Sequence, residues 1–275
     1  MSTPPPTAAE GPPPTLFAAM HHYVDLVLVL LGKEFKVRYK NTVLGYVWSV
    51  LHPLAFALVY FFAFKVVMRF ETEVNYALFL IAALFPWQWF ANSVNASCGT
   101  FTGSASLITR VRFPRHLLVL AAVLNDLAHF ALSIPVIVAF MLWFGAAPSW
   151  HWLWALPLLV AGQFMLVYGL SLLAATLNLF FRDLQRLTIL ITTALFFVSP
   201  VIYGLDLMLN QAPPEYQWVF YLNPLVPLMA AWRDLFLHGA PEPLHIVLAV
   251  AQGAAALLVA MPVYRRLQWR FAELV

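Results

Sequence analysis

Side chains that can do chemistry are scarce in this sequence, and one group of them interrupts an otherwise apolar stretch. Asn125, Asp126, His129 and Ser133 form a polar face within residues 117–144. A carboxylate and an imidazole three residues apart can relay protons, as in a proton-coupled secondary transporter. The same face can instead form a contact between helices or subunits. No other apolar segment carries a matching acid or base near its centre, so we favour the contact.

Other catalytic chemistries find little support. The single cysteine, Cys98, excludes a disulfide framework and a CxxC metal site. His21–His22 and the scattered acidic residues do not form the cluster that a membrane glycosyltransferase or acyltransferase needs. The sequence has no GxxxxGK[ST] phosphate-binding loop, so a partner must hold any ATP that drives the protein. We expect no catalytic residue, no metal and no cofactor in this chain.

The composition places these residues in a membrane protein. Only 10% of the 275 residues are charged, 63% are hydrophobic, and the mean hydropathy is +0.81. A soluble domain is typically about 25% charged. A soluble fold of this length would lack the polar side chains needed to cover its surface. The chain is therefore predicted to be an integral membrane protein.

Six segments are long and apolar enough to cross a bilayer as helices. They are too long, and alternate too little, to be strands of a membrane barrel. The predicted fold is all-α and polytopic, with a disordered Pro-rich cytoplasmic tail at 1–24, a transmembrane domain at 46–265 and a cytoplasmic tail at 266–275. The predicted spans are 46–67, 76–96, 117–144, 152–177, 187–203 and 244–264.

The cations set the orientation. With six spans both termini share one side, and twelve of the fifteen Lys and Arg residues fall there. Cytoplasmic loops carry such an excess, so both termini are predicted to be cytoplasmic, and the net charge of +3 does not indicate nucleic-acid binding. The twelve are Lys33, Lys36, Arg38, Lys40, Arg110, Arg112, Arg115, Arg182, Arg186, Arg265, Arg266 and Arg270; Lys65, Arg69 and Arg233 lie opposite.

Residues 25–45 are predicted to form an amphipathic helix in the lipid headgroup region. Apolar residues recur at every fourth position, and the cations lie on or beside another face. Such cations are attracted to anionic lipid, and simple anchoring of the topology explains them equally well. The apolar stripe is Leu31, Phe35, Tyr39 and Val43; the cations are Lys33, Lys36, Arg38 and Lys40.

Several stretches together resemble one known family, the ABC-2 type permeases that export bacterial polysaccharides. These membrane subunits move O-antigen, and in relatives teichoic acid or capsule, across the inner membrane. The resemblance implies a homodimer with six spans per subunit, two copies of a separate ATPase that binds ATP and Mg, and a lipid-linked polysaccharide as substrate. The stretches are "FKVRYKNTVLGYVWSVLHPL" (35–54), "LITRVRFPRHLL" (107–118), "LNLFFRDLQRL" (177–187), "VSPVIY" (198–203), "YLNPLVPLMAAWRDLFL" (221–237) and the closing "FAELV".

Two basic loops on the cytoplasmic side are candidates for contact with the ATPase. Pro114 should interrupt a helix running into the third span. The resemblance makes the segment before it, residues 103–116, a coupling helix, although its arginines can also simply fix the topology. In "FRDLQR" the cations either form a second ATPase contact or a joint against the amphipathic helix. The coupling residues are Ile108, Arg110, Arg112, Phe113, Arg115, Arg182 and Arg186.

The forty residues 204–243 are too apolar for a free loop, and their apolar runs are too short to span twice. They are predicted to form two short helices folded back into the outer leaflet, which the resemblance makes an outer gate; an interfacial cap is the alternative. The gate residues are Tyr221, Asn223, Pro224, Pro227, Trp232 and Arg233. An aromatic belt at the outer boundary comprises Trp143, Trp150, Trp152, Trp154, Trp218 and Trp232.

Aromatic stripes on the first two spans suggest a substrate path. Flat apolar rings let the C–H faces of a neutral polymer slide past, although such stripes also serve packing or face lipid. The predicted lining is Phe56, Tyr60, Phe85, Trp87 and Trp89. The predicted substrate entrance is Lys36, Arg38 and Lys40, whose cations can bind the diphosphate of a lipid-linked glycan.

Overall fold

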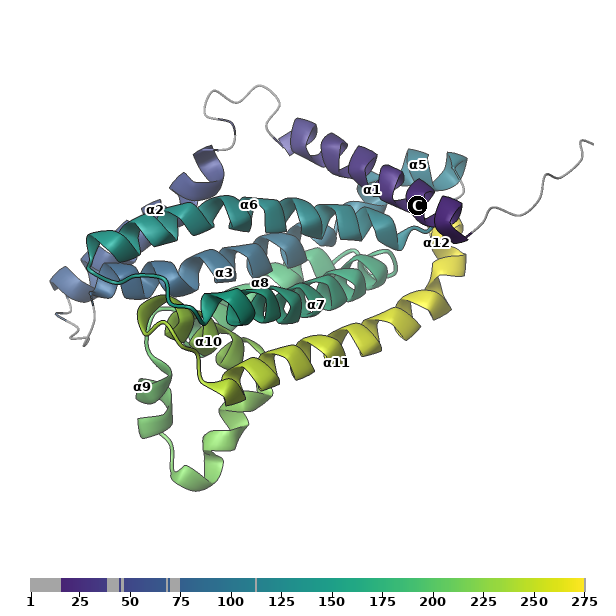
Figure 1. Ribbon diagram of the computed structural model, residues 1–275. Helices are drawn as coiled ribbons and strands as arrows, with labels where there is room; N and C mark the ends of the chain where they lie inside the picture. Colours follow the sequence, from purple (N-terminus) through teal and green to yellow (C-terminus); the bar gives the residue numbers. More distant parts are fainter. Residues whose placement is uncertain are drawn as a thin grey trace, which may run out of the picture.

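The computed structural model of the chain is helical throughout its described part (Figure 1). It describes residues 16–38, 45, 47–67, 69, 75–111 and 113–274, and these contain no β-strand. Five helices in this part are long and apolar enough to cross a membrane. The predicted all-α polytopic fold class is therefore confirmed at this level.

These five helices coincide with five of the predicted spans. The first combines an α-helix with a following π-helical segment, and the others are continuous. They are α2 (Val47–Tyr60) with η1 (Phe61–Val67), α3 (Tyr76–Ser97), α6 (His116–Trp143), α7 (Trp152–Asn178) and α11 (Pro243–Leu267).

The predicted fifth span, 187–203, differs from the structure. Its helix, α8 (Leu184–Val198), has 15 residues, which is about 22 Å at 1.5 Å per residue against a hydrocarbon core of about 30 Å. The residue before a proline is disfavoured in helical geometry. Ser199, which precedes Pro200, is extended (φ −105°, ψ 153°), and the helix ends there. Five of the six predicted spans are therefore present as long apolar helices. The remaining one, the predicted fifth span, is a shorter apolar helix.

α3 lies at the centre of the bundle and contacts α2, α6, α7, α8 and α10 (Leu225–Leu237). Because neighbours surround it, its side chains are buried on nearly every face. α11 lies along α7 (Figure 1), where three glycines allow the backbones to approach closely. A Cβ added at Gly253 would clash with the carbonyl oxygen of Gly162, and one at Gly169 would lie 2.8 Å from the backbone of Ala256.

The amino-terminal helix, α1 (Leu16–Arg38), packs against α6. It begins inside the stretch predicted to be disordered, because the last proline of that stretch is Pro14 and none of the following residues breaks a helix. The predicted amphipathic helix extended to residue 45. Residues 39–44 lie outside the described part of the chain, as do the side chains of residues 35–38.

Short helices occupy the two ends of the bundle (Figure 1). One end holds α4 (Thr100–Gly103), α5 (Ala105–Arg110), η3 (Gln268–Arg270) and α12 (Phe271–Leu274), so the predicted carboxy-terminal tail is folded onto the bundle. The opposite end holds α9 (Leu205–Asn210), the 3-10 helix η2 (Pro214–Leu222) and α10.

Candidate functional site

One end of the bundle is basic. It comprises α5, the turn between α7 and α8, and the carboxy-terminal end of α11, and its cations are mostly exposed. The helix break expected at Pro114 is present, since α5 ends at Arg110 and α6 begins at His116. The described cations of this end are Arg110, Arg115, Arg182, Arg186, Arg265, Arg266 and Arg270.

Some of the residues predicted for coupling are exposed, and others are buried or bonded within the chain. Arg110 is exposed at the end of α5, whereas Ile108 is buried in this chain and anchors the helix. Phe113 is half-buried. Arg115 points to the carboxy-terminal segment, where its Nη1 donates to the carbonyl oxygen of Gln268 at 2.6 Å. Arg112 lies outside the described residues, so its role stays a prediction.

The second basic loop is fixed by a side chain that the sequence did not reveal. Asn178, buried at the end of α7, donates to the carbonyl oxygen of Cys98 at 2.8 Å and accepts from the backbone N–H of Gln185 at 3.1 Å. It therefore joins the ends of α3 and α7 to the start of α8. Arg182 and Arg186 are exposed on either side of this joint.

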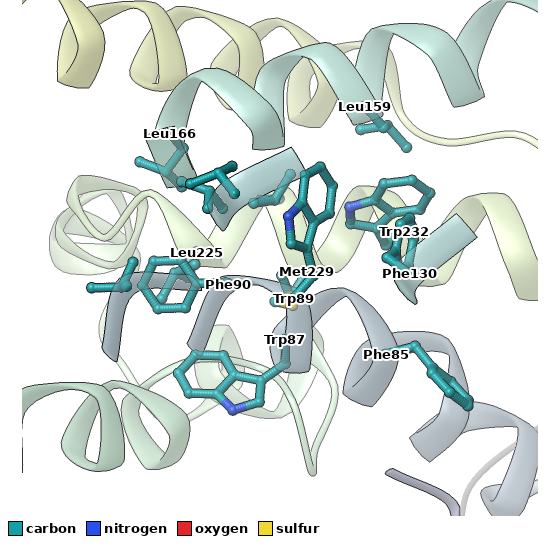
Figure 2. Packing of buried hydrophobic residues seen from close by; sticks show 14 of the residues in the cluster. Phe85, Trp87, Trp89, Phe90, Phe130, Leu159, Leu166, Leu225, Met229 and Trp232 are labelled. Carbon is teal, nitrogen blue, oxygen red and sulfur yellow. The ribbon is translucent and has the colours of Figure 1, made fainter. Parts of the chain in front are cut away.

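The aromatic residues of α3 are buried within the single chain (Figure 2), and two of them, Phe85 and Trp89, also line the cavity described below, so their role in a substrate path stays a prediction. Trp87 is buried with its ring edge against Phe196, at 5.3 Å between ring centroids. Trp89 stacks on Phe130 at 5.2 Å and 18°. Because α3 is surrounded by other helices, these rings contribute packing within one chain. Phe56 and the partly buried Tyr60, on α2, remain at the surface of the single chain.

Trp232 also differs from its predicted position at the outer boundary. It is fully buried, and its Nε1 donates to Oε1 of Gln163 at 2.6 Å. The amide of Gln163 donates in turn to the carbonyl oxygen of Pro86 at 2.7 Å. A buried indole needs such a partner, and here the pair joins α10, α7 and α3. Of the predicted belt, Trp143, Trp150, Trp154 and Trp218 are exposed and Trp152 is half-buried.

The polar face of α6 meets α3 beside a cavity of about 280 Å³. The hydroxyl of Ser93 donates to Oδ2 of Asp126 at 2.9 Å, and both residues are buried. This bond links α6 to α3, in keeping with the favoured interpretation of Asp126 as a contact between helices. The cavity lies between α2, α3 and α6, and its lining is Trp48, His52, Pro53, Phe85, Gln88, Trp89, Asn92, Asp126, His129 and Phe130.

At the opposite end, Arg233 ties the predicted gate to α8. Its two terminal nitrogens each donate at 3.0 Å, one to the carbonyl oxygen of Tyr203 and one to that of Val201. Its guanidinium carbon lies 3.7 Å from the ring centroid of Phe79, a close cation–π contact. Arg233 is buried, so backbone carbonyl groups and a ring face, rather than water, solvate its charge.

The start of α10 is held to the same region. Asn223 donates to the hydroxyl of Ser199 at 2.9 Å and accepts from the N–H of Leu225, the first residue of α10, at 3.1 Å. Pro224 precedes α10 and Pro227 lies in its first turn, where a missing N–H costs nothing. Tyr221 accepts through its carbonyl oxygen from the amide of Gln252 at 2.6 Å.

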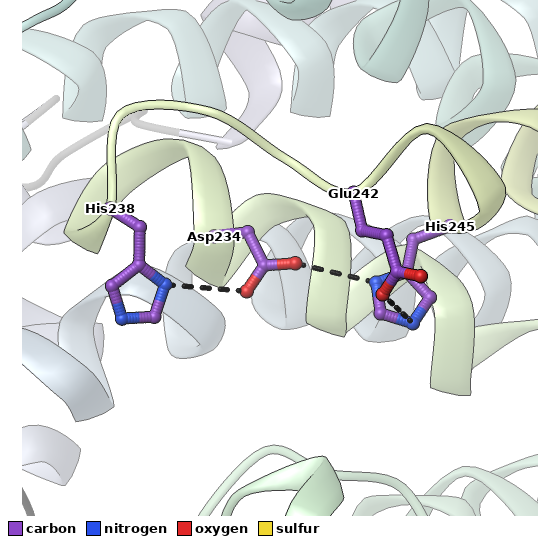
Figure 3. Close-up of polar contacts among 4 residues, drawn as sticks. All are labelled: Asp234, His238, Glu242 and His245. Carbon is purple, nitrogen blue, oxygen red and sulfur yellow. Dashed lines mark hydrogen bonds and ion pairs between the residues drawn. The ribbon is translucent and has the colours of Figure 1, made fainter.

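Two acidic residues and two histidines form a cluster of contacts at the turn between α10 and α11 (Figure 3). One carboxylate oxygen of Asp234 lies 3.3 Å from Nδ1 of His245, and the other lies 3.6 Å from Nδ1 of His238. Glu242 lies 3.6 Å from Nε2 of His245. This cluster was not predicted from the sequence, although its members fall within twelve residues.

Comparisons with known proteins agree over most of the chain. Residues 25–237 match the family described as ABC-2 type transporter. The O-antigen export system permease protein RfbA of Klebsiella pneumoniae is 40% identical over 251 residues, which cover 91% of this chain and 95% of that protein. RfbA of Myxococcus xanthus is 31% identical over 94% of this chain and 98% of its own. The polysialic acid transport protein KpsM of Escherichia coli is 24% identical over 78% of this chain and 81% of its own.

Proposed function

Because the chain belongs to the ABC-2 type transporter family, we propose that it is the permease subunit of an ABC exporter and that its cargo is a lipid-linked O-antigen polysaccharide. The observation that carries the proposal is the 40% identity with an O-antigen export permease over 91% of this chain. The bundle of apolar helices with one basic end supports it. The capsule-type relative shares 24% identity, which makes a capsular cargo the less favoured alternative.

The proposal requires a separate motor. The sequence contains no GxxxxGK[ST] loop, so an ATPase present in two copies would hold ATP and Mg. We place its docking surface at the basic end, with Arg110 presented on α5 and with Arg182 and Arg186 beside the joint at Asn178. Since cations mark the cytoplasmic face, this end faces the cytoplasm of a bacterial inner membrane, and both termini lie there. α8 and the turn residues after it would then complete a sixth pass.

The proposed path lies between two copies of the chain. Phe56 and Tyr60 lie along α2, on which several large apolar side chains remain exposed. A second copy set against this helix would enclose a path with aromatic rings on both sides. The segment α9–η2–α10 would close its outer end as a re-entrant gate, with Arg233 and Asn223 holding it to α8. Lys36, Arg38 and Lys40 remain our candidates for the entrance.

Gene deletion and complementation test the proposal. Deleting the gene from its host should remove O-antigen from the cell surface while lipid-linked polymer accumulates inside, and re-expression should restore export. Surface O-antigen is measured with an antibody on intact cells, and total polymer is measured after lysis. Unchanged surface O-antigen together with loss of another surface polymer would refute the cargo. A second strain that lacks only the partner ATPase should show the same phenotype.

A further inference from the structure

The carboxy-terminal segment Gln268–Leu274 is packed against the loop that carries the proposed docking helix. Phe271 is fully buried, with its ring centroid 4.9 Å from that of Phe101 and 5.9 Å from that of Tyr264. In Figure 1, α12 lies beside α5, and the two helices are in contact. The end of the chain is therefore anchored by a large apolar side chain, as an element of the core is.

Two polar contacts hold the loop from the other side, one to this segment and one to α11 just before it. Arg115 donates to the carbonyl oxygen of Gln268 at 2.6 Å, and its guanidinium carbon lies 5.9 Å from the ring centroid of Phe271. The backbone N–H of His116 donates to the hydroxyl of Tyr264 at 3.1 Å. The position of the loop between α5 and α6 thus depends on the carboxy-terminal segment as well as on its own residues.

Together, the loop and the segment enclose an open hollow of about 640 Å³. Two apolar residues at its rim remain uncovered, since Val111 is 49% exposed and Trp269 is 80% exposed. A tryptophan this exposed gains little within one chain, and Trp and Arg are the residues that most often dominate protein interfaces. The lining is Ile108, Thr109, Arg110, Val111, Phe113, Arg115, Gln268 and Trp269.

The charge around the hollow selects its partner. Arg110 and Arg115 line the hollow itself. Three exposed cations, Arg265, Arg266 and Arg270, lie within four residues of Trp269 in the sequence. Glu273 is the one acidic residue within the segment Gln268–Leu274. A complementary surface therefore presents carboxylates around an apolar side chain, because opposite charges across an interface raise the association rate and fix the register.

We infer that Gln268–Leu274 forms the second half of the docking surface for the motor ATPase, which inserts an apolar side chain flanked by carboxylates between Val111 and Trp269. This inference rests on the proposed function and extends it, since that function places the contact only on α5 and on the turn between α7 and α8. The carboxy-terminal segment then has two roles, to position the loop through Phe271 and to bind the partner through Trp269.

Photo-crosslinking separates this inference from the proposed function. The full chain carries p-benzoylphenylalanine at Val111, at Trp269 or, as a control at the opposite end, at Trp218, which is 61% exposed. Each variant is co-expressed with the ATPase subunit of the same export system, and membranes are irradiated. Mass spectrometry then tests whether the crosslinked chain contains a GxxxxGK[ST] loop. We expect crosslinks from positions 111 and 269 and none from 218.

The outcomes distinguish the two claims. A crosslink from position 111 without one from 269 overturns the inference and leaves the proposed function standing. No crosslink from either position refutes ATPase docking at this end altogether. Crosslinks from 269 to phospholipid alone would make Trp269 an interfacial anchor and would equally overturn the inference.

A substitution pair gives an independent measurement. Trp269→Ala should reduce the affinity of the purified chain for the ATPase subunit at least about tenfold, as loss of an interface anchor does, whereas Trp269→Phe should retain most of it. Both variants should keep the elution profile of the parent, since Trp269 is exposed and contributes little to the fold. Equal affinity of the parent and Trp269→Ala would overturn the inference.

Discussion

The close approach of α7 and α11 predicts that Gly→Ala substitutions change the stability of the protein by graded amounts, depending on where the methyl group is added. A Cβ at Gly253 would clash with the carbonyl oxygen of Gly162, and a Cβ at Gly169 would lie 2.8 Å from the backbone of Ala256. Backbone atoms cannot rotate away, so the helices must separate. A Cβ at Gly162 would meet Val250 at 3.2 Å, a tight but smaller overlap, whereas Gly32 has nothing within 4 Å.

The magnitudes follow from two opposing effects. Replacing a helical glycine by alanine stabilises the helix by about 1 kcal/mol, and overpacking costs about 1–3 kcal/mol. Gly32→Ala should therefore be stabilising, Gly162→Ala close to neutral, and Gly169→Ala destabilising by up to about 2 kcal/mol once both effects are summed. Gly253→Ala should be the most destabilising of the four, because its clash is the closest.

Thermal unfolding of the detergent-purified protein, followed by loss of its monodisperse chromatographic peak, measures this order. The midpoint should fall along the series Gly32→Ala, Gly162→Ala, Gly169→Ala, Gly253→Ala. A Gly253→Ala variant as stable as Gly32→Ala would show that the two helices are not packed as described. The reasoning about small residues at this crossing would then be refuted.

Further predictions concern the path, the docking surface and two buried groups. Phe56→Ala should reduce export and leave the unfolding midpoint unchanged, whereas Trp89→Ala should lower the midpoint, since truncating a buried Trp costs about 3–5 kcal/mol. Arg110→Glu should insert normally yet lose export and co-purification of the ATPase; full export by this variant would remove α5 from the docking surface. Asp126→Asn should leave the pH dependence of export unchanged, because Asp126 accepts a hydrogen bond from a hydroxyl on α3 and an amide oxygen can accept the same bond; an altered dependence would favour proton coupling. Burial raises the pKa of the Cys98 thiol, so maleimide labelling at neutral pH should be slow until the protein is denatured.

The long helices could be predicted from sequence because the residues that set the length and the ends of each helix belong to that helix or to its flanks. Long uncharged runs set their length, and Pro114 ended a helix where expected. The end of α8 was harder to predict, because the apolar run continues beyond the last helical residue. The helix stops before Pro200, and Val201 and Ile202 are buried without being helical. Hydropathy detects burial and does not distinguish a helix from a folded turn.

The burial of individual aromatic side chains was harder still to predict, because it depends on which helices pack against the helix that carries them. Trp218 and Trp232 lie in the same apolar stretch, yet one is 61% exposed and the other is fully buried. The difference comes from α10, which packs against α3, α7 and α11 and so brings Trp232 to the amide of Gln163. The Asp234–His245 contact escaped notice for the same reason, since it exists only once α10 and α11 meet.

The position of Arg233 on the side assigned to the exterior is explained by its packing. Arg233 is one of three cations on the side that the charge distribution assigns to the exterior. Its guanidinium bonds to the two carbonyl groups of Val201 and Tyr203 and covers the ring of Phe79. Removing it would leave those buried carbonyls unpaired, which costs about 1–3 kcal/mol for each buried group. This exception to the charge asymmetry thus joins α10 to the residues that follow α8, and the orientation drawn from the other cations does not depend on it.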